Sequence, residues 1–89
     1  MQIARVLKNL VATRKHDAYR GKKILIVQPL DRNDKPAGEQ VVAVDLVDAG
    51  IGDLVLVSSE GRFARETFGK DAPIRSMIVA ILEGVEYEV

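Results

Sequence analysis

The chain has 89 residues, no cysteine and a formal net charge of zero, from thirteen Lys and Arg and thirteen Asp and Glu. This length predicts one domain over residues 1–89, and a domain of this size buries only about 60–65% of the surface that its unfolded chain exposes. The absence of cysteine excludes disulfides and thiolate metal sites, and the single histidine, His16, needs several carboxylates around it to bind zinc. Zero charge favours association, so partner subunits are the expected support.

The composition also argues against two classes of partner. The only aromatic residues are Tyr19, Phe63, Phe68 and Tyr87, with no tryptophan, whereas a nucleic-acid-binding protein usually shows a basic face or stacking aromatic residues. The longest apolar run, residues 77–82, is far shorter than a membrane span. The N-terminal residues do not follow the pattern of a secretory signal. We therefore expect a cytoplasmic protein that binds neither nucleic acid nor a membrane.

The N-terminal segment carries a helical pattern. Its apolar residues lie at positions i, i+3, i+4, i+7 and i+8: Ile3, Val6, Leu7, Leu10 and Val11. Taken alone, this spacing predicts an amphipathic helix.

The next three apolar segments have the features of strands. Residues 22–30 are short and β-branched, residues 31–38 are dense in turn residues, and residues 39–47 are apolar again, which predicts a hairpin. After a second turn, residues 53–58 are apolar on both sides. This pattern indicates a strand with one face on the core and the other on a partner.

The period changes after residue 58. Ser59 can cap a helix over residues 60–68, and Gly69 with Pro73 can end it. Residues 74–89 then form a long strand. With a strand at the N-terminus, the order predicts a mainly β protein, a small five-stranded OB-like barrel with one short helix before the last strand.

Motifs that would indicate catalysis are incomplete. Gly50-Ile-Gly52 lacks the third glycine and the following helix of a dinucleotide site, so it predicts a tight turn. No phosphate-binding loop and no nucleophile elbow are present. A dyad of His16 and Asp17 acting on Ser58 or Ser59 has no support from the spacing. We predict a protein that is not an enzyme, with no catalytic, cofactor-binding or metal-binding residues.

A few residues leave alternatives open. Asp45 lies inside an apolar strand, so it either faces solvent or is buried and hydrogen-bonded. Phe63 and Arg65 either serve core packing and a salt bridge or form a contact between subunits. The basic stretch 14–23 is an exposed loop, a patch for an acidic partner, or a docking site for a neighbouring subunit.

Several segments together resemble one known family. They are MQIARV (1–6), VATRK (11–15), KILIVQPLD (23–31), VAVD (42–45), AGIGD (49–53), VLV (55–57), AR (64–65) and IVAI (78–81). Taken in order, they are similar to the EutN/CcmL family, the pentameric vertex proteins of carboxysomes and metabolic microcompartments. The resemblance covers essentially the whole chain.

The resemblance implies a five-stranded barrel whose first segment is a strand, against its helical spacing. It also implies a structural shell protein that forms a homopentamer, meets hexameric shell tiles, and closes the vertices of a microcompartment in the cytoplasm. The alternative is an OB-like binding module for nucleic acid or oligosaccharide, which needs exposed aromatic residues and a positive face.

The chain departs from the family pattern at two places. Members commonly carry glycine where this chain has Asn9, and asparagine tolerates left-handed backbone, so a bulge can persist there. Members also favour Gly-Ser-Ser-Ala-Arg where this chain has Gly61-Arg62-Phe63-Ala64-Arg65. The candidate residues near a subunit interface or central pore are Asp45, Gly61, Arg62, Phe63 and Arg65.

Overall fold

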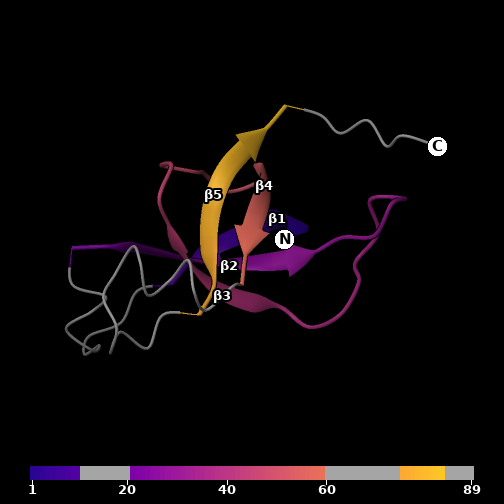
Figure 1. Cartoon of the computed structure of the whole chain (residues 1–89), viewed down its shortest axis with the longest axis horizontal. Coiled ribbons are helices and arrows are strands. Elements are labelled where there is room, and N and C mark those ends of the chain that lie inside the picture. Colours follow the sequence, from indigo (N-terminus) through magenta and orange to yellow (C-terminus); the bar gives the residue numbers. More distant parts are fainter. Residues whose placement is uncertain (11–20, 60–74, 84–89) are drawn as a thin grey trace.

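A computed structural model describes residues 1–10, 21–59 and 75–83. Its strands are β1 (Gln2–Asn9), β2 (Lys23–Pro29), β3 (Val41–Asp45), β4 (Leu54–Ser58) and β5 (Met77–Leu82). They close into a barrel in the order β1-β2-β3-β5-β4 (Figure 1). The predicted five-stranded barrel is therefore confirmed. The predicted helix over residues 60–68 lies outside the described residues.

The N-terminal segment is a strand, as the family resemblance implied and its helical spacing did not. β1 pairs with β2 along one edge and with β4 along the other, both antiparallel. Ala4 and Val6 point into the core, each 1% exposed. Pairing on both edges outweighs the local helical pattern, because the barrel cannot close without this strand.

β1 also contains an irregularity. Its register with β2 shifts between Val6 and Lys8, so the extra residue is Leu7. Asn9, where we expected a bulge, pairs with Leu25. The bulge thus lies two residues before the predicted position.

The predicted hairpin is confirmed. β2 and β3 pair antiparallel, from Lys23 opposite Asp45 to Val27 opposite Val41. In the loop between them, the carboxylate of Asp31 accepts hydrogen bonds from the backbone N–H groups of Asn33 (2.8 Å) and Lys35 (3.1 Å). This local bonding holds the tip of the loop, and β2 holds its far end, since the backbone N–H of Ala37 donates to the carbonyl of Pro29 at 2.9 Å.

The barrel closes where β5 meets β3. These two strands are parallel and share only two residue pairs, Val44 with Met77 and Asp45 with Ile78. On its other edge β5 pairs antiparallel with β4 over most of its length. The core inside the barrel is aliphatic: Ala4, Val6, Leu25, Val27, Ala43, Ala49, Val55, Val57 and Ile78.

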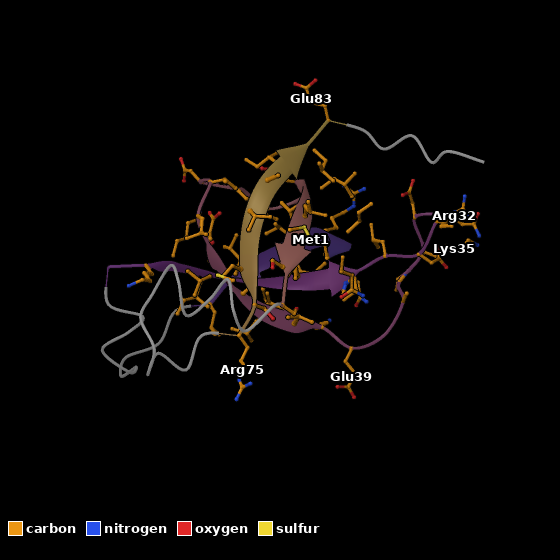
Figure 2. The ribbon with its side chains drawn as sticks, in the orientation of Figure 1. Met1, Arg32, Lys35, Glu39, Arg75 and Glu83 are labelled. Atoms are coloured by element: carbon orange, nitrogen blue, oxygen red, sulfur yellow. The ribbon has the colours of Figure 1, made fainter. Side chains whose placement is uncertain are left out.

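Charged side chains project away from this core. Figure 2 shows Arg32 and Lys35 on the β2–β3 loop, Arg75 before β5 and Glu83 after it, all pointing outward. No helix in residues 1–10, 21–59 or 75–83 has the length and apolarity that crossing a bilayer requires.

Candidate functional site at the loop between β3 and β4

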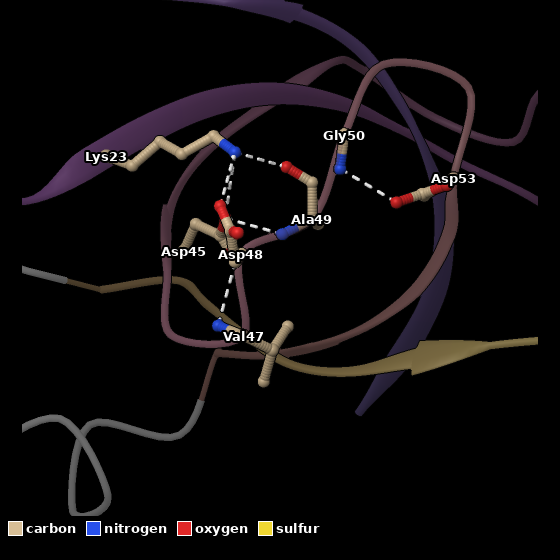
Figure 3. A network of polar contacts seen from close by, with 7 residues as sticks. All are labelled: Lys23, Asp45, Val47, Asp48, Ala49, Gly50 and Asp53. Carbon is tan, nitrogen blue, oxygen red and sulfur yellow. Dashed lines mark hydrogen bonds and ion pairs between the residues drawn. The ribbon is translucent and has the colours of Figure 1, made fainter.

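Asp45 is the last residue of β3. Of the two alternatives predicted for its side chain, exposed or buried and hydrogen-bonded, the structure shows the second. Its side chain is 0% exposed. One carboxylate oxygen, Oδ1, accepts a hydrogen bond from the backbone N–H of Val47 at 3.0 Å, and Oδ2 accepts one from Ala49 at 2.7 Å (Figure 3). A buried carboxylate needs such donors, and these bonds are charge-assisted. Asp45 therefore shapes the first half of the loop after β3.

Lys23 binds the same loop from the neighbouring strand. It begins β2 directly opposite Asp45, and its ammonium donates hydrogen bonds to the carbonyl of Ala49 and, at 3.2 Å, to the carboxylate of Asp48. The ammonium nitrogen also lies 3.6 Å from Oδ2 of Asp45. The hydrogen bond to Asp48 raises the pKa of Lys23 above 10.5; the negative charges of Asp48 and Asp45 act in the same direction, and desolvation opposes them.

This raised pKa predicts a dependence of stability on alkaline pH. A group whose pKa is higher in the folded state contributes its full stabilisation below the unfolded pKa, and that contribution falls as the pH rises through the folded value. We expect the melting temperature of the wild type to exceed that of Lys23→Met at pH 9, and the difference to shrink above about pH 10.5. Thermal melts of both proteins between pH 8 and about 12 measure it. A difference that stays constant over this range contradicts the prediction.

The second half of the loop is a tight turn, as predicted for Gly50-Ile-Gly52. The N–H of Gly50 donates to the carboxylate of Asp53 at 2.7 Å, and the N–H of Asp53 donates to the carbonyl of Gly50 at 3.0 Å. Gly52 has a φ of +89°, a backbone conformation that side chains disfavour. The formation of a tight turn therefore explains the two glycines of this motif.

The turn is also fastened to β1. The N–H of Gly52 donates to the carbonyl of Val6 at 2.9 Å, and the N–H of Val6 donates to the carbonyl of Asp53 at 3.0 Å. The guanidinium of Arg5 donates to the carbonyl of Gly52 at 2.8 Å. Residues 46–53 are thus held to β1, β2 and β3 by bonds on both halves of the loop.

This fixed loop presents apolar side chains to solvent. Leu46 is 40% exposed and Ile51 is 67% exposed, while Ala49 between them is fully buried in the core. β1, β3 and β5 all run in one direction, since β1 and β3 are both antiparallel to β2 and β5 is parallel to β3. The loop borders β1 and β5: Gly52 is bonded to Val6 of β1, and Leu54, directly after the loop, pairs with Leu82 at the end of β5. The loop and the end of β5 are in the upper part of Figure 1.

Exposed apolar residues gather in the loop and in the two strands that it borders. Seven large hydrophobic residues are exposed in the described part of the chain, and five of them belong to the loop, to β1 and the residue after it, or to β5. We call these five the apolar rim: Leu7, Leu10, Leu46, Ile51 and Ile81. Exposed apolar side chains that gather on one part of a soluble protein indicate a site of association.

The structure does not describe the other predicted site residues. Gly61, Arg62, Phe63 and Arg65 lie outside the described residues, as does His16. Sequence reasoning missed the apolar rim, although one signal was available: Ile51 is a β-branched apolar residue inside a glycine turn, where a polar residue is usual. In the part of the chain that the structure describes, no three His, Cys, Asp or Glu side chains come together as a metal site.

The fold and the loop define a closed OB-like barrel with a rigid apolar rim, and comparison with known proteins identifies its family. Residues 1–83 match the family described as "Ethanolamine utilisation protein EutN/carboxysome". The chain belongs to the EutN/CcmL family, as its sequence motifs indicated.

Similar sequences and similar solved structures both lead to this family. The chain is 38% identical over 85 residues to the carboxysome shell vertex protein CcmL of Synechocystis sp., covering 96% of this chain and 85% of that protein. It is 38% identical over 87 residues to the microcompartment shell vertex protein GrpN of Rhodospirillum rubrum, covering 97% of each.

Among solved structures, the pentameric microcompartment shell protein GrpN from Rhodospirillum rubrum superposes with a TM-score of 0.84 at 30% identity, and the alignment covers 100% of both chains. The structure of CcmL from Nostoc sp. superposes with a TM-score of 0.83 at 34% identity, covering 96% of this chain and 92% of that one. The barrel is therefore the fold of these shell proteins over its whole length.

Proposed function

We propose that this chain is a structural shell protein, not an enzyme, which forms a homopentamer and caps the vertices of a polyhedral bacterial microcompartment. The observation that carries the proposal is the end-to-end match to proteins named as shell vertex proteins, one of them solved as a pentameric shell protein. Its place is then the microcompartment shell, in the cytoplasm. Residues 1–89 act as one domain, and the hexameric tiles of the same shell are its further partners.

The function is geometric. A flat layer of six-fold tiles cannot close on itself, so five-fold units are needed at the corners. A head-to-tail contact repeated around an axis closes into a ring when its rotation matches the symmetry. A small barrel with no net charge and with exposed apolar residues suits this role, because its own copies can bury what the single domain cannot.

The proposed pentamer also gives a place to the candidate residues of the 61–65 segment, where the chain departs from the family pattern. We propose that Gly61, Arg62, Phe63 and Arg65 lie at the subunit interface or near the central pore. Asp45 acts on the interface indirectly, since its buried carboxylate fixes the backbone of the adjoining loop.

The oligomeric state tests this function. Five protomers of 9.8 kDa give a particle of about 49 kDa, which native mass spectrometry and analytical ultracentrifugation resolve from a monomer. We expect this particle at micromolar protomer concentration. A chain that stays monomeric at high concentration and binds an oligonucleotide or oligosaccharide instead would support the alternative of an OB-like binding module.

A further inference from the structure

We propose that the apolar rim is one of the two surfaces through which neighbouring copies of this chain contact each other in the ring. This inference rests on the proposed pentamer and adds to it the part of the barrel that is buried there. The occupant of the rim is a second copy of the same chain.

The first argument is the exposure of the rim. Ile51 is 67% exposed and Ile81 is 43% exposed, although both are large aliphatic residues of a small chain with a net charge of zero. Burying such side chains removes apolar surface from water, which is the main favourable term in association.

The second argument is the rigidity of the loop that carries Leu46 and Ile51. Asp45 and Lys23 fix its first half, while Asp53 and Arg5 fix its second half, through the hydrogen bonds seen in part in Figure 3. A surface that is already ordered loses less conformational entropy on binding, so it gains more affinity from the same contacts. An ordinary solvent loop has no need of two anchors.

The third argument identifies the occupant. A relative that aligns over all of both chains is a pentameric shell protein, so a barrel of this shape meets copies of itself. In a cyclic pentamer the contact is head-to-tail, which means that the rim of one copy meets a different surface of the next. The rim is thus half of a contact and need not be self-complementary.

A pair of matched substitutions tests the inference. Ile51→Asp places a charge in the rim, and Ile51→Leu keeps an apolar side chain of the same size at the same position. We expect Ile51→Asp to raise the protomer concentration needed for pentamer formation by about ten-fold or more, the size of a single hot-spot residue. Ile51→Leu leaves that concentration within about three-fold of the wild type.

Sedimentation of the three proteins over a dilution series gives the result, with circular dichroism to verify that each is folded. A pentamer of Ile51→Asp that persists at wild-type concentrations overturns the inference, and so does an Ile51→Leu ring that dissociates as readily as that of Ile51→Asp. The wild-type result is separate: a monomeric wild type removes the proposed function itself, whereas a pentameric wild type with an insensitive rim removes only the rim assignment.

A second measurement avoids dependence on a destabilising charge. The chain has no cysteine, so Ile51→Cys introduces a single reactive thiol. We expect a maleimide to label Ile51→Cys about ten-fold more slowly in the assembled ring than after dilution to monomers, because the rim is buried in the contact. Equal labelling of Ile51→Cys in ring and monomer contradicts the inference.

Discussion

Replacing Asp45 with asparagine is expected to lower the free energy of unfolding by about 2–4 kcal/mol. The carboxylate is fully buried and each of its oxygens accepts a backbone hydrogen bond, from Val47 and from Ala49. An amide has one acceptor oxygen, so one of these N–H groups would face another donor at a position closed to solvent. Bonds to a charged acceptor are also stronger than bonds to a neutral one.

Asp48→Asn is the matched control. Asp48 lies in the same loop and binds the same lysine, but its side chain is 95% exposed. We expect this change to cost less than about 1 kcal/mol, since exposed ion pairs contribute little. Asparagine also suits the positive φ of +58° at this position. Urea unfolding of both variants at one protomer concentration gives the comparison. Equal decreases in the free energy of unfolding would show that the burial of Asp45 does not add to its contribution to stability.

The strands of the barrel could be predicted because their signals are local. Residues 22–30 and 39–47 are apolar runs bounded by turn residues, and the structure places β2 and β3 within them, paired as a hairpin. The turn at Gly50-Ile-Gly52 was equally readable, because only glycine adopts the backbone of Gly52 at little cost.

The first strand could not be read from its residues alone. Its apolar positions follow the period of a helix, and what makes it a strand is pairing with β2 and β4, which begin 21 and 52 residues after the start of β1. The family resemblance supplied that information, since it carries the outcome of tertiary contacts that no local pattern records.

The candidate site divides in the same way. The sequence limited Asp45 to two possibilities, and the choice between them depended on whether backbone N–H groups converge on its carboxylate, which is a property of the loop in three dimensions. The apolar rim is assembled from β1, β5 and the β3–β4 loop, and these segments are brought together only when the barrel closes. Spacing along the chain gives no sign of such a surface.

Replacing Ile78 with alanine is expected to lower the free energy of unfolding by about 2–5 kcal/mol. Ile78 is 0% exposed, and it belongs to the strand that closes the barrel. It lies opposite Asp45 in the short parallel pairing of β5 with β3 and opposite Val57 of β4. A cavity here removes packing at the place where the fewest backbone pairs join the sheet. Since a domain of this length has a total stability of about 4–13 kcal/mol, the loss leaves little reserve.

Ile81→Ala separates the effect of burial from that of residue type. It is the same substitution in the same strand, at a side chain that is 43% exposed in the single chain. We expect a cost below about 1 kcal/mol in urea unfolding of the dissociated protomer, because little new cavity forms at an exposed site. Assembly adds stability by mass action, so each variant is compared with the wild type at two protomer concentrations that differ ten-fold. A deficit of Ile78→Ala that is the same at both concentrations belongs to the barrel, whereas a deficit of Ile81→Ala that depends on concentration belongs to the contact between copies.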